Sequence, residues 1–191
     1  MRTAVVWMCS LLIATSSLAA EGSGEARRLT EQLRGYIDRS AYPAADRTFR
    51  AMSELNGVKL TADDLFMGAE SARALGNMNA CQERLLAAFR LALNEEVKID
   101  ERARAWLAEL NDSYGRVDVY SKGAGTLAPE MQPFQSDRRA AIAHADARIA
   151  ETGRFEGLLP VGSYTWGKSD FVVEAGSEPV KIKIKGPKKK K

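Results

Sequence analysis

Apolar positions between residues 24 and 114 recur at intervals of three and four, the spacing of one face of an α-helix. The pattern predicts helix throughout this segment. Breaks are expected at Asn56-Gly57 and Gly76-Asn77, because these residue types tolerate the left-handed backbone that ends a helix. Thr61 and Asp100 are expected to cap the helices that follow them. The first apolar stripes are formed by Leu29, Leu33, Tyr36, Ile37, Ala45, Phe49 and Met52.

The helical segment contains an internal repeat of 36 residues. Of eight positions between Leu29 and Met52, most agree in size class with the positions 36 residues later, between Leu65 and Ala88. The pattern resembles the tetratricopeptide repeat over about residues 26–93, with leucine in place of the usual tryptophan and without the closing proline. The resemblance implies two antiparallel helix pairs stacked side by side. The residues expected to pack the repeats are Tyr36, Ala45 and Phe49 in the first copy and Ala72, Cys81 and Leu85 in the second.

Each packing residue has an expected mechanical role. Small side chains at Ala45 and Cys81 let the second helix of a pair approach the first, while Phe49 and Leu85 fill the space between neighbours. Two repeats bury little apolar surface alone. We therefore expect the helix at 100–114 to cover the open end, with Trp106 against the second repeat together with Leu107. The alternative is a plain helical bundle without a binding groove.

From Gly115 the apolar period changes to two, which is typical of strands. The sequence predicts a strand at 116–120, a loop at 122–133, a helix at 136–152 capped by Ser136, and short strands from Phe155 to Lys185. A turn is expected at Pro160, with Gly162 at its last position. This Leu-Pro-x-Gly-x-Tyr turn followed by two strands resembles the PEGA and carboxypeptidase-regulatory type of small β-sandwich, which is generally non-catalytic.

The expected fold class is therefore α+β. An N-terminal array of antiparallel helical hairpins, similar to tetratricopeptide repeats, occupies residues 20–114. A small antiparallel β-module with an inserted helix at 136–152 occupies residues 115–185, and a disordered lysine tail occupies residues 186–191.

The first 19 residues have the layout of a secretory signal peptide. A positive start at Met1-Arg2 precedes a mostly apolar stretch that is shorter than the about 20 residues of a membrane span. Small residues at Ser17 and Ala19 predict cleavage near Ala19. We expect a protein exported to a bacterial-type periplasm or cell surface. The alternative is an uncleaved N-terminal anchor.

The formal net charge of +3 is unevenly distributed along the chain. Residues 20–180 hold 20 basic and 25 acidic side chains, whereas residues 181–191 hold seven lysines and no acid. The basic balance thus describes the tail, and no nucleic-acid partner is expected. Lys181, Lys183 and Lys185 share one face of a strand, where they would protect a sheet edge. The candidate contacts to an anionic membrane surface are Lys188, Lys189, Lys190 and Lys191, with an inert solvated end as the alternative.

Candidate catalytic chemistry is sparse. His144 is the one histidine of the chain, so no Glu-x-x-His or His-x-x-His pair exists for a metal. The acid pairs Asp63-Asp64 and Glu95-Glu96 fall at a helix start and past a helix end, where acids have structural roles. We expect Cys81 to be a buried small side chain. The sequence predicts no catalytic, cofactor-binding or metal-binding residue.

These observations favour a non-catalytic adaptor or scaffold protein of the cell envelope, in which the helical hairpins present a groove to another envelope protein or peptide. A second hypothesis is a structural subunit of a surface assembly, with Tyr164 and Trp166 as exposed interface anchors. The alternative for both side chains is a place in the core. An enzyme acting on wall glycan is less favoured. The oligomeric state stays open.

Overall fold

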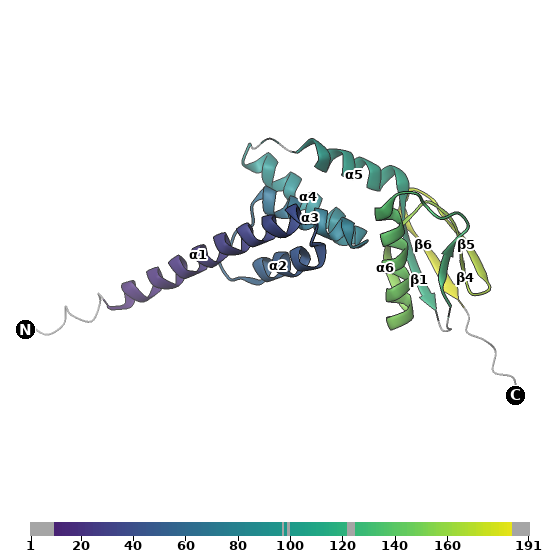
Figure 1. Ribbon diagram of the computed structural model, residues 1–191, viewed down its shortest axis with the longest axis horizontal. Helices are drawn as coiled ribbons and strands as arrows, with labels where there is room; N and C mark the ends of the chain where they lie inside the picture. The colour runs from purple at the N-terminus through teal and green to yellow at the C-terminus, as the bar shows by residue number, and fades with distance from the viewer. Residues whose placement is uncertain (1–9, 97, 99, 122–124, 185–191) are drawn as a thin grey trace, which may run out of the picture.

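The computed structural model describes residues 10–96, 98, 100–121 and 125–184, with side chains from residue 24 onward. Five helices come first: α1 (Ser10–Asp38), α2 (Tyr42–Glu54), α3 (Ala62–Ala74), α4 (Met78–Asn94) and α5 (Glu101–Ser113). The β-module follows: β1 (Tyr114–Ser121), β2 (Leu127–Pro129), α6 (Ser136–Thr152), β3 (Arg154–Pro160), β4 (Gly162–Trp166), β5 (Ser169–Val173) and β6 (Gly176–Ile184). A helical region thus precedes a β region with an inserted helix (Figure 1), and the predicted α+β class is confirmed.

The two helical hairpins share one turn geometry, repeated after 36 residues. Ser40 and Gly76 both have positive φ, at 55° and 77°. The amide of Ala41 donates to the Tyr36 carbonyl at 2.8 Å, and the amide of Asn77 donates to the Ala72 carbonyl at 2.9 Å. The backbone therefore repeats at the spacing found in the amino-acid pattern.

The packing of the hairpins follows the same repeat. Ala45 and Cys81 have exposed fractions of 0% and lie at equivalent positions of α2 and α4, as predicted. Phe49 and Leu85 are also buried. A Cβ atom on Gly68 would lie 2.4 Å from Cδ2 of Phe49, so α2 and α3 touch at a position that admits no side chain.

The helix ends match their predicted signals with one exception. The Thr61 hydroxyl accepts from the Asp64 amide in a capping box, and Asp100 accepts from the Arg102 amide. Gly57 has a φ of 78° after α2. Ser136, however, is the first residue of α6, and the N-cap is Gln135, whose side chain makes no capping hydrogen bond. The expected cap at Ser136 is wrong by one residue.

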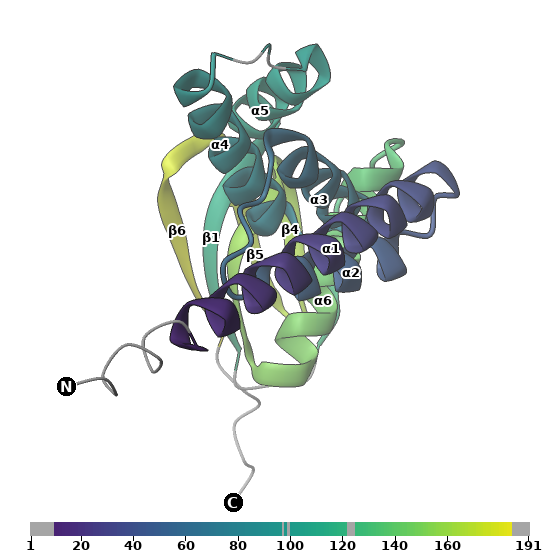
Figure 2. The ribbon, with the colours of Figure 1, turned by 90° about the vertical axis from the view of Figure 1, so that its left-hand side faces the viewer.

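The β-module consists of two three-stranded sheets in the orders β3-β1-β6 and β2-β4-β5. β1 pairs antiparallel with β3 but parallel with β6, so the module is not antiparallel throughout. The chain crosses from the second sheet to the first after β5. It therefore enters β6 at the end where β1 begins, with Gly176 opposite Gly115. Figure 2 shows β6 at the outer edge of its sheet.

Two further details of the β-module differ from the sequence predictions. The segment expected as loop contains the short strand β2, which pairs with β4. Pro160 and Gly162 do not join two paired strands, because β3 and β4 belong to different sheets. The turn at Val161 instead carries the chain from one sheet to the other.

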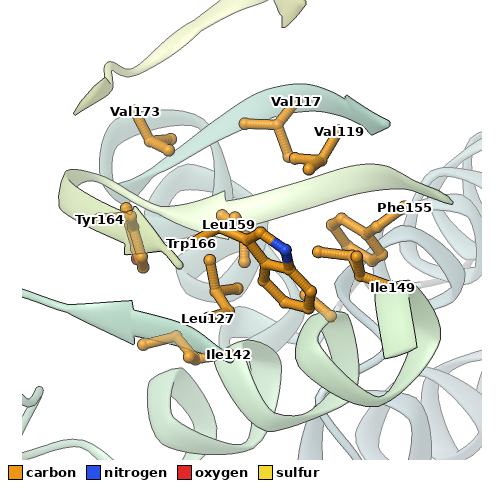
Figure 3. Packing of buried hydrophobic residues seen from close by; sticks show 11 residues of the cluster. Val117, Val119, Leu127, Ile142, Ile149, Phe155, Leu159, Tyr164, Trp166 and Val173 are labelled. Atoms are coloured by element: carbon orange, nitrogen blue, oxygen red, sulfur yellow. The ribbon is translucent and has the colours of Figure 1, made fainter. Parts of the chain in front are cut away.

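The two sheets and α6 enclose one hydrophobic core. Figure 3 shows the Trp166 indole among Leu127, Leu159 and Ile149 of α6. Alternate residues of β1 and β4 point into this core, as expected for strands. The buried members are Val117, Val119, Leu127, Ile142, Ala145, Ile149, Phe155, Leu159, Tyr164, Trp166 and Val173.

Helix α6 lies between the strands and the helical hairpins (Figure 1). A Cβ atom on Gly76 would lie 2.1 Å from the Ala140 carbonyl oxygen, so the second hairpin turn presses against α6. Arg73 of α3 bonds Glu109 of α5 at 2.7 Å and Asp137 of α6 at 2.6 Å. Within the described residues, no helix is long and apolar enough to cross a membrane.

Candidate protein-binding surface

Tyr164 and Trp166, the aromatic residues expected as exposed anchors, are 2% and 1% exposed. The Tyr164 hydroxyl donates to the Pro160 carbonyl at 2.7 Å, and its ring stacks on Phe171 with centroids 5.6 Å apart. Both side chains point inward because they occupy alternate positions of β4 that face the core. Their prediction as surface anchors is therefore wrong.

The lysines of the C-terminal region divide into two groups. Lys181 and Lys183 are exposed on the edge strand β6, which agrees with the predicted protection of a sheet edge. Lys185 and the candidate membrane contacts Lys188, Lys189, Lys190 and Lys191 lie outside the described residues.

The face that α3 and α5 share is closed by its own side chains. Phe66 is buried and stacks on Trp106, with ring centroids 5.1 Å apart. The guanidinium of Arg102 lies 4.9 Å from the Phe66 centroid, and that of Arg73 lies 4.9 Å from the Trp106 centroid. Such contacts cover the rings with charge. Only a small hollow of about 130 Å³ remains beside Phe66, lined mainly by Ala88, Phe89, Ala92 and Ala103. Trp106 and Leu107 pack on the second hairpin as predicted.

The most exposed apolar side chains lie instead on the segment between β2 and α6. Phe134 is 96% exposed and Met131 is 82% exposed. They border a groove of about 450 Å³ between residues 129–135 and the segment from Pro160 to Tyr164. We call this the loop groove. Pro129, Pro133 and Pro160 contribute to its lining, and Val161 at its rim is also exposed.

The backbone of the loop groove is held in place by specific hydrogen bonds. Arg139 donates from Nη1 to the Pro133 carbonyl at 3.0 Å and also to the Phe134 carbonyl. The Glu130 amide donates to the Ser163 carbonyl at 2.9 Å. On the opposite side, the Val161 amide donates to the Ser113 carbonyl at 3.0 Å. These bonds fix the loop on α6 and on the strands while the Phe134 ring extends into solvent.

Sequence reasoning missed the loop groove. Met131 lies in the segment 122–133, which its Gly and Pro content predicted to be a loop. Phe134 is the first residue after that segment. The usable signal was the placement of two large apolar side chains in a short polar segment with prolines at 129 and 133, where no core position was expected. Two large exposed apolar side chains beside one groove make this surface a candidate interaction site.

The candidate chemical groups have ordinary environments. Burial raises the pKa of Cys81 to about 12, so its thiol stays protonated. Asp64 accepts the capping hydrogen bond of Thr61, and Asp63 pairs with Arg34 at 2.8 Å. Among the described residues, no group of three His, Cys, Asp or Glu side chains is placed to hold a metal ion.

His144 is half-buried on α6, with its ring edge-on to Phe155 at 6.3 Å. Burial lowers its pKa, and the charge of Arg148 lowers it further. The imidazole is therefore mainly neutral at pH 7.

Comparison with models of protein families found no match to this chain, and neither did comparisons with curated proteins and with solved structures.

Proposed function

We propose that this protein is a non-catalytic protein-binding scaffold of the cell envelope, and that the loop groove takes an apolar segment of another envelope protein. The observation that carries the proposal is Phe134, a fully exposed aromatic ring beside a proline-lined groove. Aromatic and methionine side chains are enriched at protein interfaces, and a few central side chains supply most of the binding energy there.

The rigidity of the loop supports the same proposal. A ring on a fixed backbone loses little conformational entropy when it binds, which favours affinity. Arg139 supplies this rigidity through two loop carbonyls. The helical hairpins then act as the platform to which the β-module is attached through α6. In this proposal the leader at 1–19 directs the chain to the envelope, and the lysine tail adds electrostatic contact with an anionic membrane.

A structural subunit of a surface assembly stays the second hypothesis, but Tyr164 and Trp166 are buried and do not serve as its anchors. A second copy of this chain remains an occupant that the experiment distinguishes.

The proposal is tested by placing a photo-crosslinking phenylalanine analogue at position 134 and, as a matched control, at Val172, which is also exposed but lies on β5. Crosslinking in envelope fractions is expected to give a discrete adduct from position 134 only. The partner identified from that adduct is then purified. It should bind the unmodified chain at least about tenfold more tightly than the Phe134→Ala variant, as expected for loss of a central anchor.

Two results would overturn the proposal. One is an adduct pattern that is the same from positions 134 and 172. The other is a purified partner that binds Phe134→Ala as tightly as the unmodified chain. Light scattering of the isolated protein identifies a homodimer, in which case the adduct has twice the mass of the chain.

A further inference from the structure

A second hollow lies between the helical hairpins and the β-module, away from the loop groove. It has a volume of about 650 Å³ and is lined by α2, the turn before α4, the end of α6 and the start of β3. Three arginines line it, one from each of α2, α6 and β3, whereas Glu156 is the one carboxylate among its lining residues. We call this the arginine cleft; its arginines are Arg50, Arg148 and Arg154.

The guanidinium groups of the arginine cleft keep unused donors. Arg50 bonds Asp46 through Nε and Nη2, and Arg84 donates to the same carboxylate at 2.8 Å. Two guanidiniums thus share one negative charge, which leaves a net positive charge at this corner. Each arginine has five N–H donors. Among the described contacts, Nη1 of Arg50 makes no hydrogen bond.

Arg148 and Arg154 have acidic partners, but each also keeps N–H donors without a hydrogen bond among the described contacts. Arg148 donates from Nη1 to Glu151 at 3.0 Å, on an exposed pair. Arg154 donates from Nε and Nη2 to Asp118 and Glu156. The Glu151 side chain, paired with Arg148, is 70% exposed, and the Glu156 side chain, paired with Arg154, is 71% exposed. Exposed pairs of this kind are weak and readily exchange one oxyanion for another.

Two further cationic side chains lie on the first sheet, with Asp118 and Glu156 beside them. Arg154 lies opposite Tyr120 on β1, and Lys183 of β6 lies opposite the same tyrosine. Lys181 lies opposite Asp118. The chain therefore leaves β6 at the end of the sheet where Arg154 stands, and its last eleven residues contain seven lysines and no acid.

We propose that the arginine cleft binds a phosphate group of an anionic polymer or lipid. Guanidinium groups match phosphate oxygens in geometry and charge, and three arginines from separate elements line this one hollow. The site joins the hairpins to the β-module, a position where ligand sites are common. Lys181 and Lys183 then extend the contact along the rest of the same ligand.

His144 is a reporter built into the cleft, since the chain has one histidine. Its surroundings are Arg148 of its own helix, Arg154 and Glu156 of β3, and Arg50 of α2. Without ligand, burial and Arg148 lower its pKa. A bound phosphate brings negative charge next to the ring and raises that pKa.

The experiment follows the His144 Cε1–H resonance of the full chain by proton NMR during titration with inorganic pyrophosphate at low salt. We expect a saturable shift and a raised His144 pKa. The Arg50→Gln/Arg148→Gln variant should bind at least about tenfold more weakly, since charged hydrogen bonds are lost. Its fold is expected to persist because Asp46 keeps Arg84 as a partner. Arg104→Gln, an exposed position of α5, is the matched control and should behave like the unmodified chain.

A His144 resonance that pyrophosphate leaves unmoved overturns the proposal. So does a double variant, folded by circular dichroism, that binds as well as the unmodified chain. A variant lacking residues 188–191 separates the cleft from the tail and should keep the His144 response. Two competitors distinguish the sources. Competition with pyrophosphate by vesicles of phosphatidylglycerol in phosphatidylcholine identifies a lipid headgroup, whereas competition by soluble polyphosphate alone identifies a soluble polymer.

Discussion

Arginine side chains have opposite roles in the two regions of the molecule. In the helical region they lie over aromatic rings: Arg84 is 4.2 Å from the Phe49 centroid, and Arg102 is 4.9 Å from that of Phe66. In the β-module, Arg139 instead binds the backbone carbonyls beside Phe134 and leaves the ring uncovered. Arginine therefore covers aromatic rings in the helical region, whereas in the β-module it fixes a loop whose aromatic ring stays exposed.

The difference shows why repeat-like helices need not carry the binding surface. Stacked hairpins leave ring edges between α3 and α5, and in this chain charged side chains fill that space. The β-module has a small, well-packed core, so a single loop can extend a large apolar side chain without loss of stability. The binding function is then expected at the loop groove rather than on the hairpins.

The largest expected effect on stability compares the covered ring of Phe66 with the exposed ring of Phe134. Phe66→Ala should lower the free energy of unfolding by about 3–5 kcal/mol, because it empties a buried, stacked position. Phe134→Ala should change it by less than about 0.5 kcal/mol. Urea denaturation measures both. A comparable loss in the two variants would mean that Phe134 has a structural partner.

Two glycine substitutions test the contact between the second hairpin turn and α6. Gly76→Ala should cost about 2–5 kcal/mol, since it adds left-handed strain and a collision with the Ala140 backbone of α6. Gly57 has nearly the same φ but open space around it, so Gly57→Ala should cost only about 1–2 kcal/mol. Equal losses in chemical denaturation would show that the turn does not press against α6.

Asp46 tests the buried ion pairs of the hairpins. Asp46→Asn should cost about 2–3 kcal/mol, because Arg84 and Arg50 lose their shared carboxylate. Asp118→Asn, which affects the more exposed pair with Arg154, should cost less than about 1 kcal/mol. Thermal melts at pH 7 compare the two variants, and equal shifts would argue against a buried role for Asp46.

The same pair predicts an acid-dependent loss of stability. Burial alone would raise the Asp46 pKa, but hydrogen bonds from Arg84 and Arg50 outweigh it and leave the pKa lowered. The carboxylate therefore stabilises the fold above its unfolded-state pKa of about 3.9, and this contribution disappears as the pH falls through the folded-state value. Denaturation measured from about pH 6 down to about pH 2 should show a smaller loss of stability in Asp46→Asn than in the unmodified chain.

The smallest effect concerns a covering arginine. Arg102→Gln removes the cation above Phe66 and should cost about 0.5–1 kcal/mol at this exposed site. It should also increase the binding of an apolar dye to the α3–α5 face. Unchanged dye binding would mean that the ring is covered by its other neighbours.

Much of the helical region was predictable from local signals. The cap at Thr61, the left-handed residues Gly57 and Gly76, and the buried pair Ala45 and Cys81 all have short-range causes. The 36-residue spacing of the sequence pattern is also the spacing between the equivalent turns of the two hairpins. The candidate site was harder to predict, because loop composition indicated only that residues 122–133 were exposed, not that Met131 and Phe134 would border a groove.

The amino-acid sequence by itself determined which segments form the helices and most of the strands, where most of the helices end, and which small residues lie at helix crossings. These features depend on side-chain period and on backbone preferences within a few residues. Only the tertiary structure decided that β6 pairs parallel with β1, that Tyr164 and Trp166 are buried, and that Phe134 is exposed. The physical reason is that these features depend on contacts between segments far apart in the chain, which period and local preference do not specify.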